Sequence, residues 1–356
     1  MKYEAGRSAA VMPVLTGINI KKPGSQSKKI FLCLTLFFVL SLTSVSADIF
    51  MECERDAFPG SLIRLYVVAN QKITNLYVML NTENGEKIAR FDGFKYNPGQ
   101  ITGFSNILSN IECMVVIIST GSTIKSGKYQ ASVYINNEDS PKKEFPIVIV
   151  QKEFEKETIP LNKSLSGLRT DNSERKEKES QSIYKLLSTF NKENVFTDAA
   201  LMKPLTAEPC KITSKYGEIR KFVYTDGGTG NSIHNGIDYA AVKGSPVYSC
   251  AFGRVVFAGY RLVTGNSVII EHLPGLYSLY YHLDSLSVTE NTFVAQGTKI
   301  GLLGSTGLAT GPHLHWEIRN QKITVDPDFL IANSLIDKDK IISIIKSDFT
   351  DMAGGR

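Results

Sequence analysis

Histidine is rare in this chain and is confined to one stretch of it. All five histidines of the 356 residues fall between His234 and His315. Imidazole nitrogens and carboxylate oxygens are ligands that divalent metal ions take in proteins, and they must be brought together from separate segments. The concentration of histidine therefore predicts a metal site in this quarter of the chain.

Two of these histidines alternate with apolar residues at the start of an expected strand. In His313-Leu314-His315-Trp316, a period of two sends both imidazoles to one face of the strand and the apolar side chains to the other. Histidines whose backbones lie about 7 Å apart can share one site, one binding a metal while the other stands beside it or over a substrate. Alone, the pattern fits a half-buried structural strand equally well.

His234 and Asp238 add an imidazole and a carboxylate four residues apart, with Gly236 between them to let the backbone turn. By itself this spacing is a weak indication. Together with the alternating pair it gives three ligands, His234, Asp238 and His315, which leave the fourth tetrahedral position open for water. An open position is typical of catalytic zinc, so the sequence predicts one such ion per chain.

Short strands separated by glycines must position these side chains, and they define a β-rich region at residues 207–333. Alternating or apolar segments predict strands at 247–249, 253–258, 267–271, 276–282 and 315–319. The glycine-rich segment 304–311 lacks the lysine of a phosphate-binding loop and leads into a strand, so we expect it to line the cleft. No G-x-S-x-G motif accompanies the serines, which disfavours a serine hydrolase.

Six motifs stand in a characteristic order in this region. They are T-S-K-Y-G at 213–217, H-N-G-I-D at 234–238, G-S-P-V at 244–247, G-R-V-V at 253–256, L-Y-Y-H-L at 279–283 and G-S-T-G-L-A-T-G-P-H-L-H-W at 304–316. The region resembles the M23 family of metallopeptidases, the lysostaphin and LytM type that cuts the peptide part of peptidoglycan. The resemblance implies that His234, Asp238 and His315 hold zinc. It implies that His282 and His313 are catalytic, while His272 matches no required position and is expected on the surface or in a turn.

Residue types indicate how such a site would work. Zinc lowers the pKa of a bound water from roughly 16 to about 7 and polarises a carbonyl. No H-E-x-x-H glutamate is present, so His282 and His313 are the candidates for proton transfer and for donation to the oxyanion, with the division of roles left open.

The implied function is hydrolysis of peptide cross-links in peptidoglycan, whose peptide stems are the expected partner. Because the chain shows no separate wall-targeting module, a D,D-endopeptidase acting on direct cross-links is preferred to a cutter of glycyl-glycine bonds. One alternative is a catalytically silent scaffold that binds the wall or activates another hydrolase. Another is a secreted enzyme that cuts glycine-rich host proteins.

The first 47 residues have the order of a secretory signal. Basic residues precede an apolar run at 30–42, and Ser44-Val45-Ser46-Ala47 follows, which predicts cleavage after Ala47; Met12 is an alternative start. The run is shorter than the roughly 20 residues that span a bilayer, and Cys33 inside it is poorly placed for lipid attachment. We therefore expect export to the periplasm or cell envelope, with no stable membrane insertion after cleavage.

The charge balance excludes one class of function. Six basic residues and one acidic residue precede Asp48, and they account for the whole formal net charge of +5. Nucleic-acid binders carry a positive surplus on their folded part, so no nucleic-acid partner is expected. A hydrophobic fraction of 42% with 21% charged residues is that of a chain with room for two cores.

Residues 48–151 predict a mainly β domain of immunoglobulin-like sandwich type. Strands are expected at 62–68, 76–80, 114–119, 129–135 and 145–150. Asn84-Gly85 is a hairpin signal, and the segment 127–133 resembles an immunoglobulin strand with Ala131 where antibody domains carry cysteine. No titratable cluster lies here, so binding or spacing is the expected role.

Export would permit disulfides among the four remaining cysteines. The plausible pairs are Cys53 with Cys113 and Cys210 with Cys250, one in each domain, against the alternative of free buried thiols. A site made of all four thiolates is disfavoured because no two are close in sequence.

A charged linker is expected at 152–206 and a C-terminal tail at 334–356. Within the linker, Ser173 can cap a helix, and an apolar stripe recurs at helical spacing, formed by Ile183, Leu186, Leu187 and Phe190. We expect the stripe to dock on one of the domains rather than on a partner.

Overall fold

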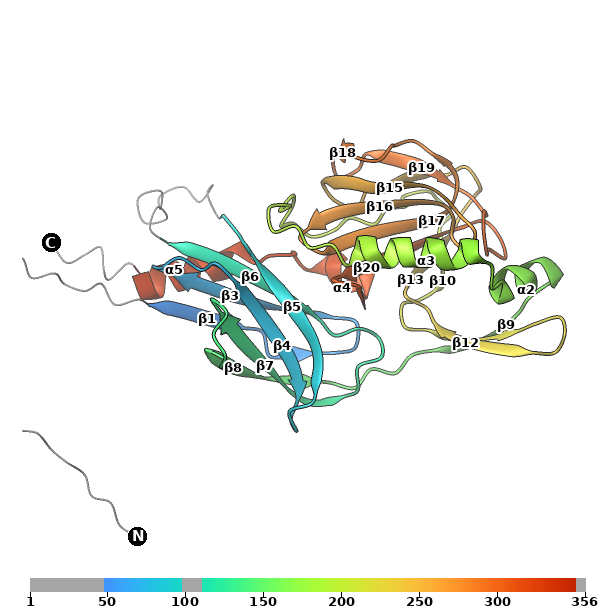
Figure 1. Cartoon of the computed structure of the whole chain (residues 1–356). Helices are drawn as coiled ribbons and strands as arrows, with labels where there is room; N and C mark the ends of the chain where they lie inside the picture. The colour runs from blue at the N-terminus through green and yellow to red at the C-terminus, as the bar shows by residue number, and fades with distance from the viewer. Residues whose placement is uncertain (1–47, 98–110, 350–356) are drawn as a thin grey trace, which may run out of the picture. The chain divides into compact units, whose positions relative to one another are not determined.

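The computed structural model describes residues 48–97 and 111–349. The predicted signal, its cleavage site and Cys33 lie outside these residues. The described chain is mainly β, as predicted, and its strands form three sheets (Figure 1). Within these ranges, none of the helices combines the length and the apolar character needed to cross a bilayer.

The N-terminal sheet has eight strands in the order β1-β3-β6-β5-β4-β7-β8-β2. Their bounds are Ile49–Cys53 (β1), Asp56–Ala57 (β2), Leu62–Ala69 (β3), Leu76–Thr82 (β4), Lys87–Lys95 (β5), Glu112–Ser119 (β6), Gly127–Ile135 (β7) and Lys143–Ile149 (β8). All five predicted strands overlap observed ones. The predicted hairpin joins β4 to β5, with Gly85 at a φ of 82°.

β5 divides this sheet into two halves that enclose a common core. It pairs with β4 through residues 87–92 and with β6 through residues 93–95. Gly93 lies at the division, where a Cβ atom would come within 2.9 Å of the Leu76 side chain and 3.0 Å of Val116. Only glycine leaves room for β5 to pass from one half to the other. The more specific immunoglobulin-like assignment stays a prediction.

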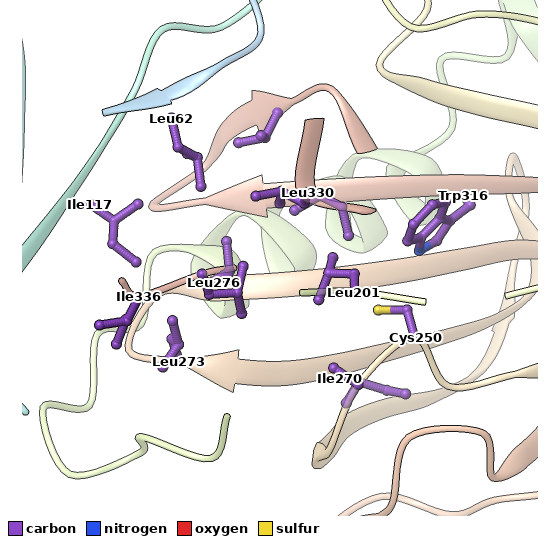
Figure 2. Close-up of a cluster of buried hydrophobic side chains, with 14 of the residues drawn as sticks. Leu62, Ile117, Leu201, Cys250, Ile270, Leu273, Leu276, Trp316, Leu330 and Ile336 are labelled. Carbon is purple, nitrogen blue, oxygen red and sulfur yellow. The ribbon is translucent and has the colours of Figure 1, made fainter. Parts of the chain in front are cut away.

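A second core covers the other face of β3 and β6. All eight residues of β3 are buried, because its side chains point alternately into two cores. Leu65 enters the core between the two halves of the N-terminal sheet, and Leu62 enters this second core. The second core joins the N-terminal sheet to the C-terminal region. Figure 2 shows Leu62 and Ile117 in the same cluster as Leu276 and Ile336.

The C-terminal sheet contains ten strands, seven of them in the order β10-β13-β20-β17-β16-β15-β18. β14 and β19 pair with each other, β19 also pairs with β17, and β21 pairs with β20. The bounds are Lys211–Ser214 (β10), Gly236–Ala240 (β13), Pro246–Tyr248 (β14), Gly253–Arg261 (β15), Gly265–Leu273 (β16), Leu276–Leu286 (β17), Phe293–Val294 (β18), Lys299–Leu303 (β19), His313–Asn320 (β20) and Ile323–Val325 (β21). Each strand predicted in this region overlaps an observed one.

A small third sheet has the order β12-β11-β9. It consists of Lys156–Pro160 (β9), Ile219–Val223 (β11) and Thr229–Ile233 (β12). β11 and β12 form an antiparallel hairpin, and β9, which comes from the expected linker, pairs in parallel with β11.

The helices are α2 (Lys163–Thr170), α3 (Glu174–Leu187), α4 (Pro327–Ala332) and α5 (Lys338–Phe349). The cap of α3 is the predicted Ser173, whose side chain accepts from the amide of Lys176. The stripe docks as expected: Ile183 and Leu187 are buried against β16 and β17 of the C-terminal sheet, along which α3 lies in Figure 1. Because the helix ends at Leu187, Phe190 lies beyond it and packs against the second core.

The segment expected to be a tail is folded as far as Phe349. Helix α5 buries Ile341, Ile344 and Ile345 in the second core. Just before it, the guanidinium of Arg64 donates to the backbone oxygens of Ser334 and Leu335. The apolar spacing of α5 in the sequence is the signal that indicates this helix.

The expected disulfides are absent, since all four described cysteines are free. Cys53 on β1 and Cys113 on β6 flank β3 and enter different cores, so their side chains lie on opposite faces of the sheet. Burial raises the pKa of each thiol to about 12, which keeps both protonated. The structure thus favours the alternative of free thiols.

Candidate metal and catalytic centre

Strand pairing brings three of the predicted site residues onto one face of the C-terminal sheet. β13 and β20 run antiparallel, with Asp238 opposite His315 and Ala240 opposite His313. Directly opposite residues point to the same side of a sheet, as do residues two apart on one strand. Asp238, His313 and His315 therefore face the same space. Leu314 and Trp316 point the other way and are completely buried.

His234 joins this group from the segment between β12 and β13. Its backbone is fixed by two hydrogen bonds, from its own amide to the oxygen of Glu218 and from the amide of Gly217 to its oxygen. Gly236 serves a different purpose from the predicted turn. A Cβ atom there would collide with the backbone oxygen of Trp316, so glycine is needed for the close approach of β13 to β20.

Three ligand atoms converge, one each from His234, Asp238 and His315. His234 Nε2 lies 2.9 Å from His315 Nδ1 and 3.1 Å from Asp238 Oδ1, and the last two atoms are 2.8 Å apart. Among the described residues, these three side chains form the group that could hold a metal ion. The possible ligand atoms, one set from each side chain, all lie within 4.8 Å of one another. Two imidazole nitrogens and one carboxylate oxygen are a donor set typical of catalytic zinc.

The remaining polar atom of each of these three residues is held by a neighbour. His234 Nδ1 donates to the backbone oxygen of Lys215 at 2.9 Å, and Asp238 Oδ2 accepts from Arg220 at 2.7 Å. His315 Nε2 lies 3.5 Å from the Glu317 carboxylate. Such partners fix ring tautomer and orientation in metal sites, so the residues present fit a zinc ion.

Charges around the cluster shift its ionisation. Burial raises the pKa of Asp238, but His234 and His315 outweigh it and hold that pKa well below its usual range. Burial lowers the pKa of His315, but the carboxylates of Asp238 and Glu317 raise it to about 9. A metal ion must therefore compete with a proton on His315.

The two predicted catalytic histidines lie beside this cluster. The ring centroids of His282 and His313 are 4.7 Å apart, and His313 Nε2 is 3.9 Å from Asp238 Oδ1. The Nδ1 atom of His282 donates to the Thr306 oxygen at 2.8 Å, and that of His313 donates to the Gly311 oxygen at 2.9 Å. Both rings thus keep Nε2 free for a reactant.

His282 has an unusual backbone for a histidine on a strand. Its φ is 60°, a region that side chains with a Cβ atom seldom adopt. The hydrogen bond from its amide to the Thr264 oxygen and the one from its ring hold this conformation. Burial, and then His313, lower the pKa of His282 to about 3, and burial also lowers the pKa of His313. Both rings are neutral at neutral pH and can accept a proton.

All five residues line one cavity of about 510 Å³. The loop at 304–311 contributes Leu308, Thr310 and Gly311 to it, as predicted. Arg220 and Glu317, which hold Asp238 and His315, were missed by the sequence analysis. Glu317 is two residues after His315, so the same period of two could have placed it on this face; nothing local singles out Arg220.

His272 is not a surface or turn residue, as was expected, but lies in the core of the C-terminal sheet with no exposed area. Its Nδ1 donates to the Phe252 oxygen at 2.9 Å, and its Nε2 is 2.7 Å from the hydroxyl of Ser278. Burial lowers its pKa to about 4, so the ring is neutral. It lies on β16, where every residue from Ser267 to Leu273 is buried, so no alternation along this strand singles out the position.

Comparison with known proteins assigns this region to a family. Residues 232–327 match the sequence profile of Peptidase family M23. These residues form an M23 peptidase domain. The matched segment contains the converging ligand atoms and both neighbouring histidines of the M23 domain.

Individual relatives match the same part of the chain. DD-carboxypeptidase/endopeptidase Mpg of Neisseria meningitidis serogroup B is 46% identical over 95 residues, which are 27% of this chain and 22% of that protein. Peptidoglycan DD-endopeptidase ShyB of Vibrio cholerae is 39% identical over 134 residues, 36% of this chain and 30% of that protein. The chain spans less than a third of the length of these curated relatives.

Solved structures also resemble the chain. A crystal structure described as a putative peptidase M23 from Pseudomonas aeruginosa aligns with 79% of this chain and 96% of its own, at a TM-score of 0.49 and 18% identity. The catalytic domain of lysostaphin from Staphylococcus simulans aligns with 35% of this chain and 92% of its own, at a TM-score of 0.29 and 28% identity.

Proposed function

We propose that this protein is a zinc-dependent endopeptidase that hydrolyses peptide cross-links of peptidoglycan in cell-wall remodelling. The observation that carries the proposal is the convergence of His234, Asp238 and His315 beside two neutral histidines in one cleft. The names of relatives that share the M23 domain, peptidoglycan DD-endopeptidases among them, support this substrate class. Cleavage of D,D cross-links is the preferred reaction.

In this proposal the roles of the five residues differ. His234, Asp238 and His315 are the zinc ligands, and His282 and His313 are the catalytic residues. A zinc ion held there would act as a Lewis acid toward the peptide carbonyl and the attacking water. The remaining chemistry belongs to the two histidines.

Those histidines are arranged to accept a proton and then to return it. Each neutral ring has its Nδ1 proton committed to a backbone oxygen, so Nε2 presents a lone pair to the cleft. As the water oxygen forms a bond to the carbonyl carbon, one ring takes the proton that the water loses. When the carbon–nitrogen bond breaks, that proton passes to the leaving amine. The second ring would donate to the carbonyl oxygen only in the form that carries a proton on Nε2.

The proposal extends to the layout and location of the chain. We assign residues 1–47 to a signal, 48–151 to an N-terminal β domain and 207–333 to the peptidase region, with 152–206 between them and 334–356 at the end. Hydrolysis of peptidoglycan requires export, which places the protein in the periplasm or cell envelope. Direct binding to peptide stems is the expected interaction.

Digestion of purified peptidoglycan tests the proposal. Mass spectrometry of the muropeptides after incubation with the zinc-loaded protein should show cross-linked dimers converted to monomers, with His282→Ala as the inactive control. The identity of the new termini reports which bond is cut. A zinc-loaded protein that binds muropeptides but leaves them intact would favour the silent scaffold instead.

A further inference from the structure

The segment between the two large sheets forms one wall of the catalytic cleft. β9 adds to the hairpin of β11 and β12 in register, with Ile159 opposite Phe222. Helix α2 follows, and Asn162 caps it by accepting from the amide of Leu165. Leu161 and Leu165 are buried against Phe222, with Leu308 of the opposite loop packed on the same cluster. This wall is therefore folded onto the M23 domain.

Arg169 extends this wall toward the site. It follows Leu165 by four residues on α2, which places both on one face of the helix. Its guanidinium carbon lies 3.8 Å from the centroid of the Phe222 ring. Arg169 lines the same cavity as His234, Asp238 and the other histidines of the site. Stacking on the ring restricts the guanidinium to one position beside the cleft.

The charge of Arg169 has no counterpart in the described chain. Two arginines line the cavity, and the other one, Arg220, is paired with Glu218 and Asp238. Among the described residues, no carboxylate lies within ion-pair distance of Arg169. Its Nε is buried without a hydrogen-bond partner. Three carboxylates line the cavity: Asp238 is paired with Arg220, Glu317 is paired with Arg319, and Glu157 lies beside Glu218.

The guanidinium has no carboxylate partner in the described chain, and its planar fork matches a carboxylate in two hydrogen bonds. We propose that Arg169 binds a free carboxylate of the peptide substrate. Leu161, Leu165 and Leu308 beside it fit a short aliphatic group next to that carboxylate. The proposal rests on the proposed function, and it makes Arg169 a determinant of which peptides are accepted.

The carboxylate could come from the C-terminus of a stem peptide or from an acidic side chain, and selective amidation separates these sources. Three synthetic cross-linked peptides serve as probes: one with all carboxyl groups free, one amidated at the C-terminus and one amidated at the side chain. Calorimetry measures their affinity for zinc-loaded, full-length His282→Ala, so binding is measured without turnover.

One of the two amidations should weaken binding by about 10- to 100-fold, the loss expected for a charge-assisted pair. Adding Arg169→Gln should lower the affinity for the peptide with free carboxyl groups by a similar factor. Amidation of the peptide should then have no further effect on binding. Arg169→Lys should recover part of the affinity. The matched control is Lys163→Gln, which removes the same charge from an exposed position of α2 outside the cavity and should behave as the parent.

Two results would overturn the inference. One is an Arg169→Gln protein that responds to amidation as strongly as its parent, and the other is equal binding of all three peptides. Turnover by the protein with His282 intact is scored separately. Cleavage without dependence on a carboxylate would remove the role of Arg169 and leave the proposed function standing. Carboxylate-dependent binding without cleavage would support the role of Arg169 and contradict the proposed function. Melting temperatures of all variants show whether α2 remains folded.

Discussion

The two large β regions of this protein differ in the side chains that their strands bury. In the N-terminal sheet the core between its halves is apolar throughout, and the buried polar residues nearby are hydroxyls and Arg64. In the C-terminal region, the buried residues include four carboxylates and three histidines, Glu218, Asp238, Glu271, Glu317, His234, His272 and His282. Chemistry is thus concentrated in one of two sheets that look alike in strand pattern.

The difference shows what a strand needs in order to carry buried polar groups. Burying an ionisable group costs free energy unless it is hydrogen-bonded or paired. Asp238 has Arg220 and two histidines, and Glu317 has Arg319. Among the described residues of the N-terminal sheet, the buried Arg64 pairs with Glu54, while the core between the two halves is built from apolar side chains and is suited to packing. The four predictions that follow would break or sharpen this contrast.

The largest effect is expected from removing one of the three proposed zinc ligands. His315→Ala leaves two of the three proposed ligands, so the purified protein should lose its zinc and essentially all peptidase activity. Metal content by mass spectrometry and muropeptide digestion measure both. A variant that retains stoichiometric zinc would mean that His315 is not a ligand.

Removing a proton-transfer group should separate metal from turnover. His282→Ala deletes a ring that lies beside the cluster, so zinc content should stay at the wild-type level while the cleavage rate falls by about 10²- to 10⁴-fold. The same two measurements apply as for His315. Wild-type rates in this variant would contradict the catalytic assignment of His282.

The N-terminal core should respond in stability and not in metal binding. Leu65→Ala removes a completely buried side chain of β3, and we expect it to lower the free energy of unfolding by about 3 kcal/mol. Ile88→Ala, at a 44% exposed position of β5, is the matched control and should change it by less than about 0.5 kcal/mol. Urea unfolding measures both, and zinc content should be unchanged. If the Leu65→Ala protein lost zinc at temperatures where it is folded, the N-terminal core would also affect metal binding. That result would contradict the contrast between the two sheets.

The smallest predicted effect concerns a buried histidine outside the site. The pKa of His272 is lowered to about 4 in the fold, against about 6.5 in the unfolded chain. Between these values the unfolded chain binds the proton more readily, so stability falls as the pH is lowered through this window.

From pH 7 to pH 5 this histidine should cost about 2 kcal/mol of stability. His272→Gln, which can keep a donor to Phe252 and an acceptor for Ser278, should remove that share of the pH dependence. Urea unfolding at both pH values measures it. An unchanged pH dependence in the variant would show that His272 does not titrate in this way.

Much of the fold and of the site is predictable from local sequence. Alternation located the strands, Ser173 with its apolar stripe located α3, and the pattern at 313–316 placed two imidazoles on one face. Where prediction failed, the missing information was non-local. His272 lies on β16, where every residue from Ser267 to Leu273 is buried, and the groups around its ring, at Cys250, Phe252 and Ser278, come from other segments. The cysteine pairing failed because β3 separates Cys53 from Cys113.

The sequence by itself determined the residue types of the site, the faces on which they lie and the family motifs that contain them. Only the tertiary structure decided that Asp238 stands opposite His315, that Arg220 holds the second oxygen of Asp238, and that Arg169 reaches the cleft. The reason is that side-chain direction follows from a period of two along one strand, whereas register and docking follow from burying apolar residues distant in the chain. Leu314, Trp316, Leu161 and Leu165 make those contacts, and no local pattern states where their partners lie.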